Sequence, residues 1–217
     1  MQQAKWLMLM VSLVIWAVAG CTSDANTTAT EGQQTGQTTP ENDVSALNWQ
    51  VPSFTYTNQD GETLGLRDLQ GKVWLTDFIF TRCPNICPPM TANMLKIQKE
   101  LKQAGVEAEI VSFSVDPEYD QPDKLKEFAE NYGVDLSSWH FVTGYSFDEI
   151  QKMVKDTFKG VVSRQEGPSP DVPVLVNHPS QFYLVDQNGK VVKFYDGLGP
   201  DVKQVVKDIK SLQQERK

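Results

Sequence analysis

Two cysteines, Cys83 and Cys87, are separated by three residues. The apolar run 73–80, rich in Val, Trp, Leu, Phe and Ile, precedes them and predicts a buried strand. The two prolines that follow Cys87 cannot continue a helix from it, but they are well suited to starting one. Free N–H groups and the positive end of a helix dipole at such a position favour thiolate over thiol. The spacing therefore predicts two potentially ionised sulfurs together on an exposed turn.

A third cysteine, Cys21, follows an apolar run near the N-terminus. The run 7–19 is short of the ~20 residues that a spanning helix needs, and with Lys5 before it the pattern predicts a signal peptide over residues 1–20. Val18-Ala19-Gly20-Cys21 looks like the lipobox of bacterial lipoproteins, in which the cysteine is acylated. An ordinary signal anchor is the alternative. In either case the folded part is exported, and a lipid at Cys21 would place it on the outer face of the bacterial cytoplasmic membrane.

If Cys21 carries the lipid, only Cys83 and Cys87 remain as thiols. Outside the cytoplasm, two thiols so close in sequence either bridge each other or share a metal. A purely structural disulfide would close a very short loop and remove little unfolded-chain entropy. The pair therefore points to redox chemistry or metal binding.

Composition sets the wider limits. The formal net charge of −8 leaves no electrostatic reason to bind nucleic acid. Residues 21–47 are polar with almost no large apolar side chain, which predicts a disordered tether carrying the lipid. Residues 48–217 have room for one sizeable core and are predicted to form a single domain.

The hydrophobic pattern of that domain alternates between the periods of strands and helices. Alternating elements predict a central mixed sheet flanked by helices, and a cysteine pair after the first buried strand is the thioredoxin arrangement. We therefore expect an α/β, thioredoxin-like fold with an N-terminal β-hairpin addition, and a surface loop at the polar, Pro-rich residues 163–173. The predicted strands are 51–56, 64–66, 73–80, 108–115, 139–142, 181–185 and 190–195, and the predicted helices are 89–104, 122–132, 146–158 and 202–212.

Three segments together resemble the Sco/SenC family. Phe80-Thr-Arg-Cys-Pro-Asn-Ile-Cys-Pro88 is similar to its Phe-Thr-x-Cys-Pro-x-x-Cys-Pro segment. Val111-Ser-Phe-Ser-Val-Asp-Pro117 resembles its strand-to-loop segment, and His178 followed by Phe182-Tyr-Leu-Val-Asp186 resembles its histidine and hairpin. The match spans roughly residues 49–212 with the three parts in the expected order.

The resemblance implies a thioredoxin-fold copper protein that helps to build the dinuclear copper centre of cytochrome c oxidase. It implies copper ligation by Cys83, Cys87 and His178, and a partner in the oxidase subunit that carries the copper site. Two thiolates and an imidazole suit Cu(I) and can also hold Cu(II). We expect a membrane-attached monomer that acts as a metallochaperone rather than as an enzyme.

The chain departs from the family pattern at three positions near the expected site. Asn85 and Asn177 stand where the family commonly has Asp, so two negative charges are missing. Pro179 replaces the more usual Ser or Thr after the histidine.

Five further residues have side chains of interest. Asp77, six residues before the first cysteine, is either a buried proton acceptor or a solvated or Arg-paired strand residue. Asp116, at the end of a predicted strand, could line the site or cap its loop. The remaining histidine, His140, is expected to be structural. Met90 and Met94, at helical spacing, are expected to pack in the core rather than to bind copper.

Two other functions stay open beside the copper chaperone. One is a thiol–disulfide oxidoreductase that reduces the cysteines of the oxidase copper site through a redox-active Cys83–Cys87 pair. The other is a peroxiredoxin-like enzyme, which would need a Thr–Cys peroxide site with an Arg nearby. Thr81-Arg82-Cys83 resembles such a site only weakly. Redox enzymes of this fold usually have two residues between the cysteines and need no histidine, so the spacing of three and His178 favour copper.

Overall fold

The computed structural model describes residues 42–170 and 172–214. The predicted signal peptide, Cys21 and most of the predicted tether lie outside this range. Within it, no helix is long and apolar enough to cross a membrane. The strands are β1 (Trp49–Gln50), β2 (Thr55–Asn58), β3 (Thr63–Gly65), β4 (Trp74–Ile79), β5 (Glu109–Ser114), β6 (Trp139–Thr143), β7 (Ser163–Ser169), β8 (Val172–Asn177), β9 (Gln181–Val185) and β10 (Lys190–Asp196). The helices are α1 (Cys87–Gln103), α2 (Pro122–Tyr132), α3 (Phe147–Phe158) and α4 (Val202–Gln214), with 3-10 turns at Ser45–Leu47 and Leu66–Leu69.

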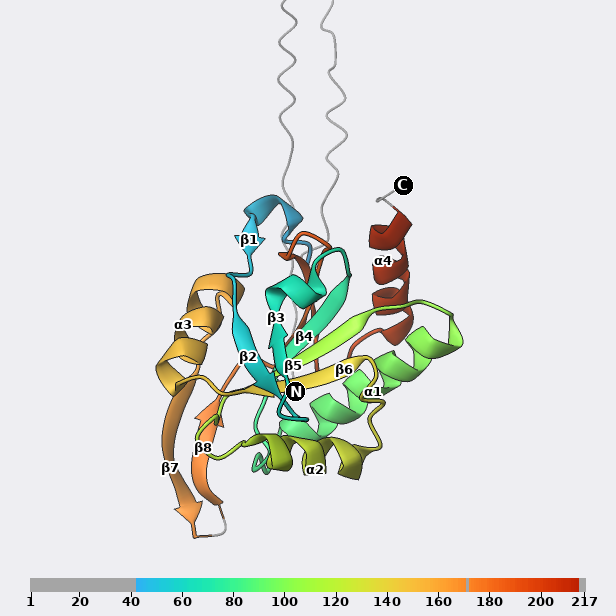
Figure 1. Ribbon diagram of the computed structural model, residues 1–217. Helices are drawn as coiled ribbons and strands as arrows, with labels where there is room; N and C mark the ends of the chain where they lie inside the picture. The colour runs from blue at the N-terminus through green and yellow to red at the C-terminus, as the bar shows by residue number, and fades with distance from the viewer. Residues whose placement is uncertain (1–41, 171, 215–217) are drawn as a thin grey trace, which may run out of the picture. The chain divides into compact units, whose positions relative to one another are not determined.

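Eight strands form one sheet in the order β1-β10-β9-β4-β5-β6-β2-β3. The pairs β4–β5 and β5–β6 are parallel, whereas the other pairs in this sheet are antiparallel. Helices α1 and α4 pack together on one side of the sheet, and α3 lies on the other (Figure 1). The predicted thioredoxin-like fold, a mixed sheet flanked by helices, is confirmed.

Strand β4 is the centre of this fold, and all six of its residues are buried. A central strand covered on both faces reads as a continuous apolar run, as the sequence of β4 does. Its parallel neighbour β5 ends beside it, with Ile79 opposite Ser114. The loops that follow these two strands therefore leave the same edge of the sheet, where the functional site lies.

The predicted N-terminal hairpin forms with different bounds. Strands β2 and β3 pair with Tyr56 opposite Leu64, and β2 also extends the main sheet beside β6. The described fold includes residues 42–47, which the sequence pattern assigns to the tether. Val44 is buried there, and its N–H donates to the carbonyl of Val192 at 2.9 Å.

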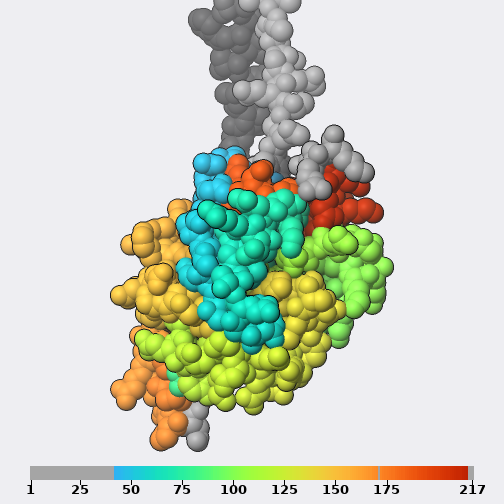
Figure 2. Space-filling model, viewed as in Figure 1, coloured from blue at the N-terminus to red at the C-terminus, as the bar shows by residue number. Residues whose placement is uncertain are grey.

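The prediction of a surface loop over residues 163–173 is wrong. This segment forms β7 and the start of β8, an antiparallel pair outside the main sheet that protrudes from the body of the domain (Figures 1 and 2). In a two-stranded sheet both strands are edges, and an edge tolerates proline because the missing N–H need not pair. Val174 and Val176 alternate along β8 and are buried, so this face anchors the hairpin.

Candidate metal centre

The two cysteines lie in the segment that leads from β4 into α1. Cys83 lies in the turn and is partly exposed, whereas Cys87 is the first residue of α1 and is fully buried. The helix begins two residues earlier than predicted. Cys87 therefore shares a helix face with Met90 and Met94, which are packed in the core as expected. The prediction of two exposed sulfurs is thus correct only for Cys83.

The histidine is brought to the cysteines by the hairpin. His178 follows β8, is 5% exposed, and places its Nε2 atom 3.3 Å from the Sγ atom of Cys87. Its ring lies edge-on to Phe80, with the ring centroids 5.9 Å apart. The ligand atoms of Cys83, Cys87 and His178 all lie within 4.8 Å of one another. The fold thus assembles the three residues that the sequence analysis expects at one site.

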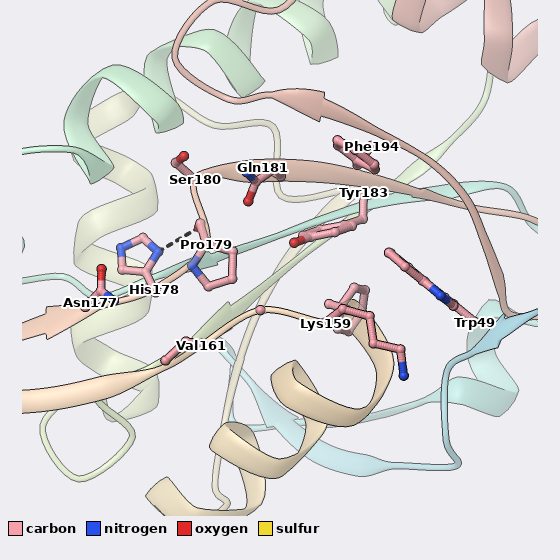
Figure 3. Close-up of a pocket in the computed structure, with 12 residues that line it drawn as sticks. Trp49, Lys159, Val161, Asn177, His178, Pro179, Ser180, Gln181, Tyr183 and Phe194 are labelled. Carbon is pink, nitrogen blue, oxygen red and sulfur yellow. Dashed lines mark hydrogen bonds between the residues drawn. The ribbon is translucent and has the colours of Figure 1, made fainter. Parts of the chain in front are cut away.

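Backbone contacts fix the orientation of the imidazole. The Nδ1 atom of His178 lies 3.0 Å from the carbonyl oxygen of Pro179, across a trans peptide bond (Figure 3). A carbonyl oxygen can only accept, so Nδ1 carries the proton. In the neutral ring the lone pair is then on Nε2, the nitrogen that faces Cys87. Metal-binding histidines are commonly oriented in this way, with the second ring nitrogen bonded to a carbonyl.

The two sulfurs differ in their electrostatics. The pKa of Cys83 is lowered to about 4, mainly because the thiol of Cys87 is placed to donate to its sulfur, with further hydrogen bonds from the backbone N–H groups of Asn85 and Cys87. One of these donors, the N–H of Cys87, lies 3.3 Å from the Sγ atom. Burial, together with the neighbouring Cys83 sulfur, raises the pKa of Cys87. The free N–H at the helix start therefore stabilises the Cys83 thiolate, and not Cys87 as the sequence pattern predicts.

A shallow cavity of about 440 Å³ borders the site on the side of His178 (Figure 3). Trp49, Tyr183 and Phe194 form much of its wall, and the side chain of Lys159 extends along it. Neither cysteine lines this cavity. The place where a metal ion would meet all three ligands is therefore the space between the sulfurs and Nε2, not the cavity.

Asp77 lies on β4 and is completely buried. Ser112 donates a hydrogen bond to its Oδ1 atom at 2.6 Å, and Oδ2 has no partner among the described residues. Burial raises the pKa of Asp77 to about 6, and its charge in turn contributes to the raised pKa of Cys87. The solvated or Arg-paired alternative is excluded, which leaves Asp77 as a buried acid behind the site.

The other candidates lie away from the ligand atoms. Asp116 is buried after β5 and pairs with Arg82 and Arg164, so it does not line the space between the sulfurs and the imidazole. His140, on β6, places its Nε2 atom 3.2 Å from a carboxylate oxygen of Glu109, as expected for a structural histidine.

Two residues near the site were not predicted. Asp120 accepts hydrogen bonds from the hydroxyl of Thr81 at 2.5 Å and from the hydroxyl of Ser114 at 2.6 Å. Arg164 lies in the segment predicted as a loop, so nothing in its local pattern connects it to the cysteines. The position of Asp120 could have been noticed in the sequence. It is an acidic residue in the loop after the predicted strand 108–115, and this loop leaves the sheet at the edge where the site forms.

Comparison with known proteins assigns the chain to a family. The sequence model of the SCO1/SenC family matches residues 42–214. The chain belongs to the SCO1/SenC family. Among its relatives is a Bacillus subtilis protein, an SCO1 protein homolog, which is 47% identical over 166 residues, or 76% of this chain and 83% of that protein.

Solved structures of SCO1/SenC proteins share the fold. A SCO1/SenC family lipoprotein from Bacillus anthracis superposes with a TM-score of 0.70 at 45% identity, covering 76% of this chain and 96% of that one. BsSco, a Sco-family cytochrome c oxidase assembly protein with a disulfide switch, gives 0.69 at 46% identity, covering 77% and 95%. Copper-bound yeast Sco1 gives 0.63 at 27% identity, covering 77% and 94%.

Proposed function

We propose that this protein binds one copper ion through Cys83, Cys87 and His178 and supplies it for assembly of the dinuclear copper centre of cytochrome c oxidase. The observation that carries the proposal is the approach of these three ligand atoms to within 4.8 Å of one another, from segments far apart in the sequence. The copper-bound yeast relative supports the choice of metal, and the oxidase-assembly role of BsSco supports the pathway.

The ligand set suits a buried but exchangeable copper ion. Two thiolates and a neutral imidazole balance the charge of Cu(II), which lowers the cost of holding the ion away from water. The same soft donors also bind Cu(I). Because Cys83 is partly exposed while Cys87 and His178 are buried, the ion would enter and leave on the side of Cys83. Such a site suits delivery to another protein.

The place of action follows from the N-terminal segment. A lipid on Cys21, after removal of residues 1–20, would anchor the protein to the outer face of the bacterial cytoplasmic membrane, with 21–47 acting largely as a tether. The Bacillus anthracis relative, which is a lipoprotein, supports this arrangement. The expected partner is the membrane-bound oxidase subunit that carries the copper site.

Copper titration of reduced protein lacking residues 1–21 tests the proposal. We expect one copper ion per chain and a visible absorption band from thiolate-to-Cu(II) charge transfer. The matched control is the same protein carrying both Cys83→Ser and Cys87→Ser, which removes the sulfur ligands and should show no band. Reduced protein that bound no copper, or bound it without the band, would contradict the assignment.

The unequal sulfurs favour thiol–disulfide exchange as a second candidate function. The thiolate of Cys83 would attack a disulfide of the partner, forming a mixed disulfide and releasing one partner thiolate. Cys87, after losing its proton, would then attack the sulfur of Cys83 and release the second. Two electrons pass from the pair to the partner as the Cys83–Cys87 disulfide forms. The pair releases one proton, from Cys87, and the partner's two thiolates become thiols by taking up that proton and one from solvent. Buried Asp77, with a pKa of about 6, is a candidate acceptor for the Cys87 proton.

Alkylation of the metal-free, reduced protein tests this second function. We expect iodoacetamide to modify Cys83 with a pH profile whose midpoint lies near 4, because only the thiolate reacts. Cys87 should stay largely unmodified in the native protein, since it is buried and its pKa is raised. Peptide mass spectrometry distinguishes the two sites, with unfolded protein as the control. Equal rates at both cysteines would argue against an attacking and a resolving thiol.

A further inference from the structure

We propose that Asp116 is a positioning residue that holds the histidine against the cysteine pair and so sets how fast copper is released. The statement about copper rests on the proposed function, whereas the statement about position does not. Two segments are concerned: the cysteine loop, residues 80–87, and the histidine hairpin, strands β7 and β8 with His178 after them.

One buried carboxylate joins these two segments. Asp116 is 1% exposed and lies after β5, at the sheet edge from which the cysteine loop also leaves. Its Oδ2 atom accepts from Arg82, with Nη2 at 2.6 Å and Nε at 3.1 Å. Its Oδ1 atom accepts from Nη2 of Arg164 at 2.8 Å. Charge-assisted bonds of this kind are stronger than neutral ones.

Through Arg82, Asp116 is connected directly to the cysteine loop. Arg82 is the residue immediately before Cys83, and its guanidinium also stacks over the ring of Tyr119 at 4.0 Å. The preceding residue, Thr81, is bonded through its hydroxyl to Asp120, from the same loop as Asp116. The start of the cysteine loop is therefore held at two successive residues, and losing one bond should not release it.

On the other side the link reaches the histidine hairpin. Arg164 lies on β7 directly opposite Val176 of β8, and Val176 is two residues before His178. Arg164 also pairs with Glu118 at 2.8 Å, and its guanidinium lies over the ring of Phe147. Arg164 therefore holds β7, the strand that pairs with β8 just before the histidine.

The hairpin depends on such side-chain contacts more than the cysteine loop does. Strands β7 and β8 pair with each other but with no strand of the main sheet, and an isolated two-stranded hairpin is marginally stable. Val174 and Val176 bury one face, and the ion pairs of Arg164 hold the β7 strand of the same hairpin to the body of the domain. Loss of the pair with Asp116 should therefore loosen His178 while the cysteines keep their positions.

The test is Arg164→Gln in the full chain, held in detergent, because this variant breaks the link on the histidine side and leaves the pair of Asp116 with Arg82. In the metal-free protein we expect faster amide hydrogen exchange over residues 174–180 and unchanged exchange over residues 80–87. In the copper-loaded protein we expect Cu(II) to pass to a chelator about tenfold faster, as loss of a charged hydrogen bond implies.

Glu118→Gln is the matched control, because it removes the other, largely exposed partner of the same arginine. We expect exchange and copper release close to wild type for Glu118→Gln, and partial recovery for Arg164→Lys. Wild-type exchange over residues 174–180 in Arg164→Gln would overturn the proposal, even if the protein bound no copper. Copper binding by wild type together with unchanged release from Arg164→Gln would overturn the release role while leaving the proposed function intact.

Discussion

Replacing His178 by Ala is expected to lower the affinity for Cu(II) by more than about 100-fold. Mutating a residue that only hydrogen-bonds to a metal ligand already lowers metal affinity by about 10- to 100-fold, and removing a ligand should cost more. The Nε2 atom of His178 is the only nitrogen ligand in the proposed set, and without it the two thiolates would leave Cu(II) one protein ligand short. Cys83→Ser and Cys87→Ser should lose stable Cu(II) binding for the corresponding reason, the loss of a soft sulfur donor.

The measurement is competition against a chelator of known affinity, with the charge-transfer spectrum recorded at each step. His140→Ala is the matched control, because it removes the other histidine, which lies on β6 beside Glu109. Thermal unfolding should show that all four variants still fold. Wild-type affinity and spectrum in His178→Ala would show that the three-ligand site is incorrect.

Copper affinity is expected to rise with pH by about tenfold per unit near neutrality, because binding releases thiol protons. The pKa of Cys83 is about 4, so this sulfur is already a thiolate at neutral pH and loses no proton. Burial raises the pKa of Cys87 above its usual range, so this thiol must give up one proton for each ion bound. Copper affinity therefore falls as the pH is lowered and rises as the pH is raised.

Calorimetric titration in buffers of different ionisation enthalpy counts the released protons directly. We expect one thiol proton per copper ion at about pH 8, and a steeper fall in affinity below about pH 4, where Cys83 also becomes protonated. Zn²⁺ titrated into the same protein provides a control that excludes oxidation of the thiols by copper. No pH dependence between about pH 7 and 9 would mean that both sulfurs are already ionised in the free protein.

Several elements follow from the sequence because their causes are local. The run 73–80 predicts a buried strand, and β4 (Trp74–Ile79) is buried throughout. The predicted helix 146–158 forms as α3, where the hydroxyl of Ser146 accepts from the N–H of Glu149 at 3.2 Å in a capping box. The predicted strands 181–185 and 190–195 form the hairpin of β9 and β10, joined by a turn at Asn188-Gly189. In each case neighbouring residues alone decide the backbone.

Local pattern fails where distant packing decides the outcome. The polar composition of 163–173 predicts a loop, but buried valines on β8 and the ion pairs of Arg164 hold the segment as a hairpin. Cys87 is predicted on an exposed turn, yet the first turn of α1 directs it into the core. Both errors arise because burial depends on what a segment packs against, and its own residues do not encode that.

Residue pattern alone is enough to place a cysteine pair after a buried strand in a thioredoxin-like α/β domain, and resemblance to a family points to His178 as the third ligand. The distance of 3.3 Å from this imidazole to Cys87, the opposite pKa shifts of the two sulfurs and the link through Asp116 emerge from the folded chain. Distances, burial and charge at the site are set by residues that are far apart in the sequence and meet on folding.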